Sequence, residues 1–432
     1  MKKKFLLLSL ICVFVGSVNA QQLQKSKQFT LEQCLEYALN NSYTQKTKQL
    51  TETAKNTIYK QSKLNVLPSV SASLSESFGN NSTTSAFSGN YSINAGLVLY
   101  NGGITSNTIE MNRLSKEQAS YSTSQYTNEL TIQILQTFLT ILGNEELLKY
   151  QQSLLTASEE QVKQGKKQFQ AGSILESDYL MLEAQYASAK NDIVDTQITR
   201  DNNLLSMKSL LSIEPTTTLE IISPDTSNIR NLAVLPTQEE ALENCMKSFP
   251  DLKISQYDVN IAEKNIAIAR ANYFPTVNLS GSIGTGHGNG YSNFSTQLSN
   301  QFNQQIGLSV SIPIYDKNET KSLVTQRKIA LQQAELENQQ TILDTRQTLV
   351  QEYQNVVSAY SKFGATEIKQ NAYKKTFEAY RAKFNAGAIT AVDLLQQQNN
   401  YISALNDYIQ SKYSFILKRK ILDVYMGLPV KM

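Results

Sequence analysis

The chain has 432 residues, with 40 lysines and arginines against 37 acids and a single histidine. Three of the lysines, Lys2, Lys3 and Lys4, lie at the N-terminus, so the rest of the chain is formally neutral and a nucleic-acid partner is not expected. The acids are scattered and the histidine stands alone, so we expect no enzyme activity, no cofactor and no metal site.

The first 20 residues have the organisation of a signal peptide. The lysines precede an apolar run over residues 5–15, and Val18-Asn19-Ala20 is a small-residue cleavage site. A short segment, residues 21–29, follows. No later stretch has 18 consecutive apolar residues, so a membrane-spanning helix is not expected. Cys34 and Cys245 fall in separate predicted helices, and free thiols are favoured over a disulfide between them.

The chain consists of two similar halves. Leu67-Pro68 in the first half corresponds to Phe274-Pro275 in the second, 207 positions later, whereas Gly172 corresponds to Gly387 at an offset of 215. The offset is already 215 between Tyr100 and Tyr315, so an insertion lies in the loop between the strand patterns, where insertions are best tolerated. We predict two repeats, residues 30–214 and 237–429, and a linker over 215–236.

Each half begins with a predicted helix, over about residues 30–64 and 237–273. Pro68 and Pro275 follow these helices, and proline cannot continue a helix.

Strand-like alternation comes next, over about residues 67–100 and 275–315. Its most regular run alternates polar residues with Ile306, Leu308, Val310, Ile312 and Ile314. Such alternation suits a tilted strand in an outer membrane, with lipid on one face and water on the other. A soluble, half-buried sheet is the alternative. The lone histidine, His287, lies in a glycine-rich stretch of this region, and we expect it to be a mobile loop residue rather than a metal ligand.

A long helix is predicted next in each half, from about Ile104 to Gln170 and from about Lys317 to Asn385. The first helix has a seven-residue apolar repeat at Ile134, Ile141, Leu148, Leu155, Val162 and Phe169. The corresponding residues of the second are Leu349, Val356, Phe363, Gln370, Phe377 and Phe384. A heptad repeat indicates left-handed supercoiling, and about 65 helical residues extend about 100 Å.

A short turn follows each long helix, Phe169-Gln170-Ala171-Gly172-Ser173 and Phe384-Asn385-Ala386-Gly387-Ala388. Glycine can close a helix in the left-handed conformation, so each turn is the predicted tip of a helical hairpin. We expect Ser173 and Thr390 to cap the returning helices. These helices run to about Leu211 and Tyr425, the second with a buried seam at Leu395, Ile402, Ile409 and Ile416.

Four strands per chain cannot close a membrane barrel, because an open edge in lipid leaves backbone groups unsatisfied. Two chains would supply eight strands, whose interior side chains largely fill. Three chains would supply twelve, enough for a water-filled lumen, and their helices would form a hollow cylinder below it. We therefore expect a homotrimer.

The duplicated halves, the proline-marked entries to the strands and both aromatic-x-Ala-Gly tips resemble the outer-membrane efflux protein family, the TolC-type trimeric channels, over essentially the whole mature chain. The resemblance implies a mixed, mainly α fold, in which a trimer forms a 12-stranded β-barrel on a 12-helix α-barrel. It also implies a place in the outer membrane of a Gram-negative bacterium, with the helices extending into the periplasm. The implied partners are outer-membrane lipid, a periplasmic adaptor and an inner-membrane transporter, and the cargo is drugs, other small molecules, metals or proteins.

The resemblance also assigns residues. It implies adaptor contacts at the two tips, at Phe169, Gly172, Ser173, Phe384, Gly387 and Ala388. It makes Asp178 and Asp393, six residues beyond the tip glycines, candidates for the periplasmic gate, with Gln396 where the family can have a second acid. The alternative for both acids is a stabilising position at a helix N-terminus. A non-pore periplasmic coiled-coil protein and a stand-alone porin are the alternative functions.

Overall fold

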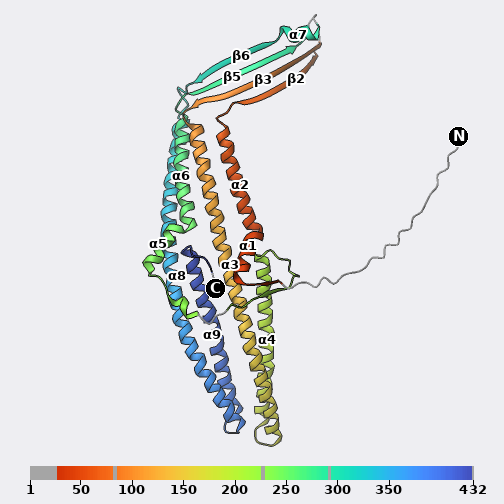
Figure 1. The fold of residues 1–432 in the computed structure, drawn as a ribbon, viewed down its shortest axis with the longest axis vertical. Helices are drawn as coiled ribbons and strands as arrows, with labels where there is room; N and C mark the ends of the chain where they lie inside the picture. The colour runs from red at the N-terminus through yellow and green to blue at the C-terminus, as the bar shows by residue number, and fades with distance from the viewer. Residues whose placement is uncertain (1–26, 81–84, 225–228, 290–292, 431–432) are drawn as a thin grey trace, which may run out of the picture.

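The computed structural model describes residues 27–80, 85–224, 229–289 and 293–430. The predicted signal peptide lies outside these residues. A four-stranded sheet lies at one end of a long helical stem, and two helical hairpins end side by side at the other (Figure 1).

The two halves have the same order of main elements. The first contains α1 (Leu31–Asn41), α2 (Tyr43–Leu64), β2 (Ser69–Asn80), β3 (Ser85–Asn101), α3 (Ile104–Gln170) and α4 (Glu176–Leu210). The second contains α5 (Gln238–Ser248), α6 (Pro250–Ala271), β5 (Thr276–His287), β6 (Asn303–Ser311), α8 (Glu319–Asn385) and α9 (Ala391–Tyr425). The predicted long helices and their return helices are confirmed to within a few residues. Among the described helices, none is both long enough and apolar enough to cross a membrane.

The first predicted helix of each half is in fact two helices. Ser42 leaves the helical conformation between α1 and α2, and its hydroxyl accepts a hydrogen bond from the Gln45 amide at 3.3 Å. In the second half the break falls at Phe249, because Pro250 opens α6 and disfavours a helical residue before it. The starts of α1 and α5 are nevertheless alike, since Thr30 and Thr237 each form a capping box.

Small elements that the sequence analysis did not predict surround the middle of the stem. β1 (Lys27–Phe29) pairs in parallel with β4 (Leu219–Ile221), and a 3-10 helix, η1, spans Ile229–Ala233. The end of the N-terminal segment and the linker thus carry short regular structure. Strands of three residues are too short to show a period. Cys34 and Cys245 are free thiols buried in helices α1 and α5, and burial raises their pKa values to about 12 and about 11.

The strands form one antiparallel sheet in the order β2-β3-β5-β6, so β3 and β5 join the two halves. β6 ends at Ser311, short of the predicted limit near residue 315, because Pro313 cannot donate to a ladder. The short helix α7 (Phe294–Asn300) lies between β5 and β6 at the end of the sheet far from the stem (Figure 1).

The prediction for His287 is wrong. It is the last residue of β5, it is 7% exposed, and its ring contacts three aromatic rings. The glycines before it, which suggested a loop, instead continue the strand opposite β3.

The heptad seam is confirmed in α8, where all six predicted positions, including Gln370, are buried. In α3 it is confirmed only in part. Ile134 and Ile141 are buried, but nearer the tip the buried residues are Leu154, Ser158, Gln161 and Gly165 rather than the predicted Leu155, Val162 and Phe169. Close packing favours small and polar residues there: a Cβ on Gly165 would lie 2.5 Å from Leu182 of α4.

Candidate functional site: the sheet faces and the hairpin tips

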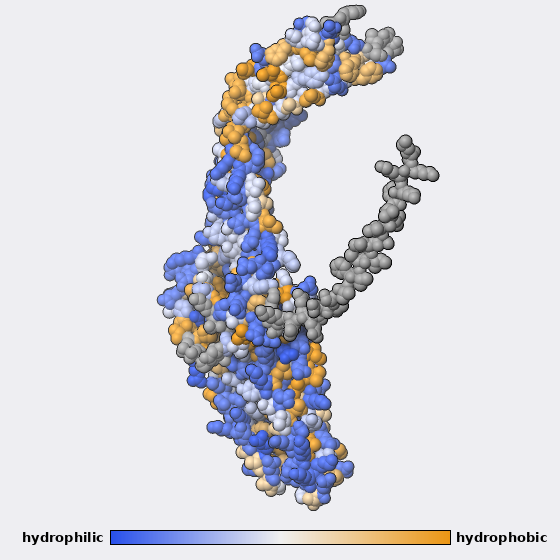
Figure 2. All heavy atoms as spheres, turned by 45° about the vertical axis from the view of Figure 1, so that its right-hand side comes forward, coloured by the Kyte–Doolittle hydropathy of each residue, from blue (hydrophilic) through white to orange (hydrophobic). Residues whose placement is uncertain are grey.

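The sheet has one apolar and one polar face. Cross-strand pairs on the first face include Ala72 with Ile93 and Leu279 with Leu308. The exposed residues of this face form a hydrophobic region over the strands, whereas most of the stem surface in the same view is hydrophilic (Figure 2). These are the properties of a sheet with lipid on one side.

The polar face has a uniform chemistry. Its cross-strand pairs are small hydroxyl, amide and glycine residues, for example Ser73 with Ser92, whose hydroxyls lie 3.1 Å apart. None of the described polar-face residues of β2, β3, β5 and β6 carries a charge. A surface of this kind is wettable but has no fixed charge to select cations or anions.

Both tips end their first helix in the predicted way. Gly172 and Gly387 have φ values of 70° and 73°. The amide after each glycine donates to a carbonyl five residues earlier, Ser173 to Gln168 at 2.8 Å and Ala388 to Lys383 at 3.0 Å. These bonds are those of the Schellman motif, which satisfies the last carbonyl groups of a helix.

The two return helices start differently. Thr390 is the N-cap of α9, and its hydroxyl accepts from the Asp393 amide at 3.2 Å. At the equivalent position of α4 stands Leu175, which has no side-chain cap and is 70% exposed. The prediction for Thr390 is therefore confirmed. The prediction for Ser173 is wrong, because the helix begins two residues too late for its hydroxyl to cap it.

The aromatic residues of the two tips also differ. Phe384 is buried, whereas Phe169 is partly exposed and stacks on Tyr179, with ring centroids 5.9 Å apart. The Gln168 amide donates to the Phe384 carbonyl at 3.5 Å and so links the tips. The remaining predicted contact residues, Gly172, Ser173, Gly387 and Ala388, are all exposed.

The two acidic gate candidates, Asp178 and Asp393, occupy the third position of their return helices. Asp393 accepts from the Thr390 amide and hydroxyl at 3.2 and 2.7 Å, and these bonds hold its pKa below the ordinary range. Asp178 is half-buried and Gln396 is exposed one turn after Asp393. Asp393 thus completes a capping box, which Asp178 does not because Leu175 offers no hydroxyl.

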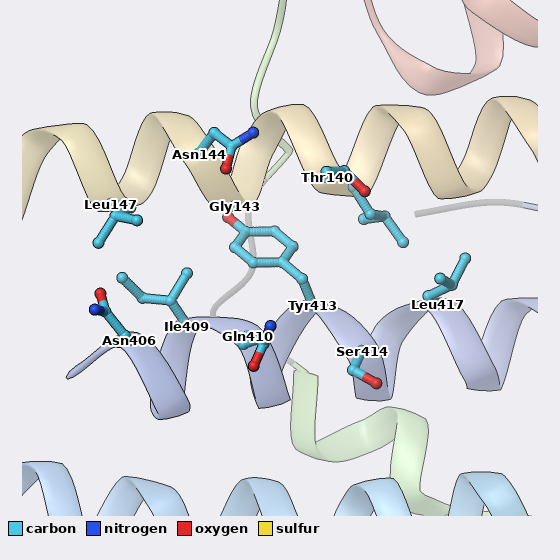
Figure 3. A pocket seen from close by; sticks show the side chains of 11 residues that line it. Thr140, Gly143, Asn144, Leu147, Asn406, Ile409, Gln410, Tyr413, Ser414 and Leu417 are labelled. Atoms are coloured by element: carbon cyan, nitrogen blue, oxygen red, sulfur yellow. The ribbon is translucent and has the colours of Figure 1, made fainter. Parts of the chain in front are cut away.

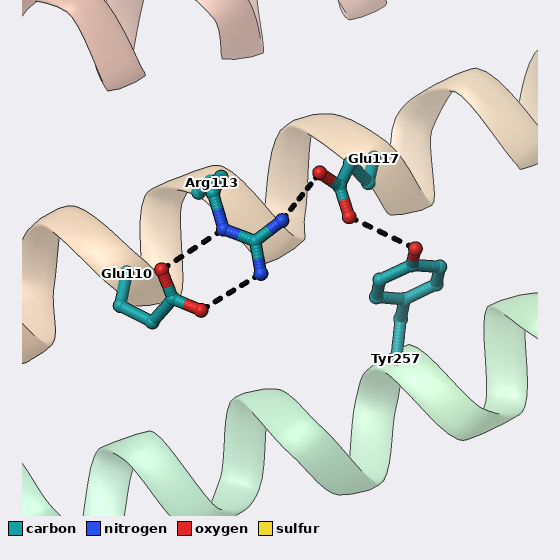
Figure 4. Close-up of polar contacts among 4 residues, drawn as sticks. All are labelled: Glu110, Arg113, Glu117 and Tyr257. Atoms are coloured by element: carbon teal, nitrogen blue, oxygen red, sulfur yellow. Dashed lines mark hydrogen bonds and ion pairs between the residues drawn. The ribbon is translucent and has the colours of Figure 1, made fainter.

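A polar network connects the two halves of the chain just below the sheet (Figure 4). Arg113 of α3 donates to both oxygens of Glu110 and, through Nη1, to Glu117. The Tyr257 hydroxyl of α6 donates to Glu117 at 2.9 Å. The sequence analysis did not identify this network, although Glu-x-x-Arg-x-x-x-Glu on one helix is a usable signal for it.

A cavity of about 380 Å³ lies between α3 and α9 at the middle of the stem. Tyr413 of α9 points from one side toward Gly143 of α3 on the other (Figure 3). Beside it, Glu146 accepts from Lys412 at 2.7 Å and from the Tyr413 hydroxyl at 2.8 Å. Closer to the tips, the buried Gln398 donates to Ser158 at 3.0 Å. Polar contacts therefore make up part of the joint between α3 and α9.

The family model for outer membrane efflux proteins matches residues 35–212 and 241–428, which is most of the chain. The chain belongs to the outer membrane efflux protein family. The family consists of channel proteins rather than enzymes, and this channel protein belongs in the outer membrane of a Gram-negative bacterium, with its helices in the periplasm.

Individual relatives are distant in sequence but close in fold. The chain is 22% identical to Outer membrane protein TolC of Vibrio cholerae over 332 residues, 73% of this chain and 75% of that protein. It is 19% identical to Alkaline protease secretion protein AprF of Pseudomonas aeruginosa, over 69% of this chain and 61% of that protein. The crystal structure of CusC superposes with a TM-score of 0.81 at 17% identity and covers 92% of both chains. The fold, the internal duplication and the outer-membrane location expected from the sequence are confirmed.

Proposed function

We propose that this protein is the trimeric outer-membrane channel of a tripartite efflux or secretion system. An inner-membrane transporter would deliver cargo through a periplasmic adaptor into the helical tunnel, and the sheet would release it outside. The observation that carries the proposal is a four-stranded sheet with two free edges, β2 and β6, set on helices about 100 Å long.

The free edges support the trimeric state. The apolar face of the sheet belongs in lipid, where an unpaired edge is too costly to persist. Pairing β6 of one copy with β2 of the next removes every edge once the ring closes. Three copies give twelve strands, an even number with room for a wet lumen.

An apolar stripe on α8 supports the same arrangement in the stem. Ile329, Leu336 and Leu343 recur every seven residues, yet they are 50%, 65% and 58% exposed in the single chain. On α2, Tyr43 and Leu50 have the same spacing and are also exposed. A heptad stripe without a partner in its own chain is explained if a neighbouring copy packs against it.

The hairpin tips are the proposed adaptor contacts. They lie at the far end of the stem from the sheet (Figure 1), and their predicted contact residues are exposed, except for Phe384. Asp178 and Asp393 occupy equivalent positions of the two halves, six residues beyond the tip glycines, and Gln396 follows Asp393 by three residues. Three copies would bring these side chains toward the axis. A ring of carboxylates there would favour cations at the entrance.

A deletion strain tests the function. We expect it to become sensitive to part of a broad panel of toxic compounds, or to lose secretion of a protein, and to recover with the plasmid-borne gene. Loss of the adaptor should give the same phenotype as loss of the channel. A stand-alone porin predicts the opposite: lower uptake of small solutes on deletion and no dependence on an adaptor.

A further inference from the structure

The membrane part of the chain contains one acid and one histidine, and the two are in contact. In the sequence, residues 65–103 and 272–315 include no Asp, Lys or Arg, and only Glu76 and His287 besides tyrosine can change charge. His287 Nε2 lies 3.1 and 3.3 Å from the two carboxylate oxygens of Glu76. An ionisable residue among lipid-facing side chains is costly, so a pair placed there indicates a role.

The contact crosses a whole strand. Glu76 lies on β2 and His287 on β5, and β3 runs between them. Both are paired with the same residue of β3, Gly89. A Cβ at Gly89 would lie 2.4 Å from His287 Nε2 and 2.6 Å from a Glu76 oxygen. Only glycine at this position lets side chains two strands apart meet.

The pair also connects to the helix at the end of the sheet. The His287 ring contacts Phe294 of α7, with ring centroids 5.0 Å apart, and the Gly288 amide donates to Gln297 of α7 at 2.8 Å. The Tyr91 hydroxyl donates to Glu76 from the stem side of the pair. His287 is therefore enclosed by β2, β3 and α7.

Elsewhere in the sheet, few side chains fix the strand register between the hairpin of β2 and β3 and the hairpin of β5 and β6. Small polar residues and glycine recur at every second position of β2 and β5, so a slip of two residues would keep residues of the same kind on each face. Glu76 and His287 have no substitute two residues away. A slip would separate them and leave a carboxylate unpaired.

We propose that Glu76 and His287 form a latch that fixes the two hairpins across Gly89 and holds α7 at the outer end of the sheet. A hydrogen bond between an imidazole N–H and a carboxylate is stronger than one between two neutral groups. The only other titratable side chain facing the pair from the described parts of β2, β3, β5, β6 and α7 is Tyr91, whose hydroxyl donates to the same carboxylate. The latch therefore ties β5, and through the His287 ring α7, to β2.

Hydrogen exchange of the intact protein in a lipid bilayer tests the proposal. The amides of residues 293–302 should exchange about threefold or more slowly in the natural sequence than in Glu76→Gln, because a hydrogen bond to a carboxylate is about twice as strong as one to a neutral amide. Equal protection in the two proteins would overturn the latch.

Two variants locate the effect. His287→Gln keeps a hydrogen-bond donor but loses the ring that contacts Phe294, so it should also speed exchange of α7. Gly89→Ala should separate the pair and speed exchange of α7 about threefold or more. Gly96→Ala is the matched control on the same strand, because a Cβ there meets nothing closer than 3.7 Å. If Gly89→Ala behaves like Gly96→Ala, the glycine crossing does not hold the latch.

Discussion

The Asp393 carboxylate accepts hydrogen bonds from both the amide and the hydroxyl of Thr390. This reciprocal contact fixes the start of α9 at the second tip, and the first tip has no equivalent because Leu175 stands in place of the threonine. The duplicated hairpins therefore have unequal ends. The helix of the second has a side-chain cap, whereas the first has none and exposes the apolar side chain of Leu175.

Removing the cap should loosen the second tip only. Thr390→Ala is expected to cost about 1 kcal/mol of local stability, the usual loss for an N-cap threonine. Hydrogen exchange of residues 391–394 measures it. Ser173→Ala is the control at the first tip, where the hydroxyl caps no helix, and should change exchange little. Equal effects of the two substitutions would contradict the unequal tips.

The same tip should depend on pH in the acid range. Because the pKa of Asp393 is lowered in the folded protein, its capping contribution is fully present above the ordinary aspartate value of about 4. It is lost as the pH falls through the lower folded value. Protection of residues 391–394 should therefore be constant from about pH 7 to pH 5 and fall below about pH 4. Asp393→Asn should remove this step, and a step that persists in the variant would assign it to another group.

The buried contact of Glu146 with Lys412 should be costly to break from one side. Lys412 and Glu146 side chains are 10% and 20% exposed, so Glu146→Ala leaves an ammonium group nearly without water. We expect a loss of about 3–5 kcal/mol in the free energy of unfolding. Adding Lys412→Met should recover much of it, because the unpaired charge is then gone. A double variant no more stable than Glu146→Ala would show that packing, not charge, dominates at this joint.

Two helical glycines should respond oppositely to alanine. Gly165 of α3 makes room for the buried Leu182, which a Cβ would approach to 2.5 Å, so Gly165→Ala should destabilise the protein by about 1–3 kcal/mol. Gly364 of α8 has no atom within 4 Å of the Cβ position in the single chain. Gly364→Ala should therefore stabilise α8 by up to about 1 kcal/mol through helix propensity. Thermal unfolding of the two variants side by side gives the comparison.

The stripe on α8 should be required for assembly. Leu336→Lys places a charge at the centre of the proposed contact between copies and should favour smaller species. Arg327→Glu, at an exposed position on the opposite side of α8, is the control and should leave assembly unchanged. Light scattering of the detergent-solubilised variants distinguishes them. Normal assembly of Leu336→Lys would remove the stripe from the interface.

Most of the fold could be predicted because long periodic segments dominate this chain. A recognisable sequence pattern marks each of the main elements: the 67-residue helices, the strands that follow a proline, and the glycine tips. Each pattern occurs in both halves of the chain. The breaks at Ser42 and Phe249 were missed because one cap or one proline interrupts an otherwise continuous helical pattern. The upper strand at His287 was missed because glycines on a strand look like a loop until the partner strand is known.

The candidate site could be predicted less completely. The tip glycines and Thr390 follow from local backbone chemistry. The capping role of Asp393 is equally local, because its partner Thr390 is three residues away. The joint at Glu146 and the contact of Glu76 with His287 depend on neighbours in space that are more than 200 residues apart in sequence. Ser158 and Gln161 could not be predicted from the spacing of apolar residues, because they are polar. They are buried because the helices pack closely at these positions.

The number of chains in the native channel is the most direct test of the account. Native mass spectrometry of the mature protein, extracted from the outer membrane in detergent, should give the mass of three chains, and the same preparation should conduct ions across a lipid bilayer. A species with the mass of one chain, and no conductance, would contradict the shared barrel on which the proposed function depends.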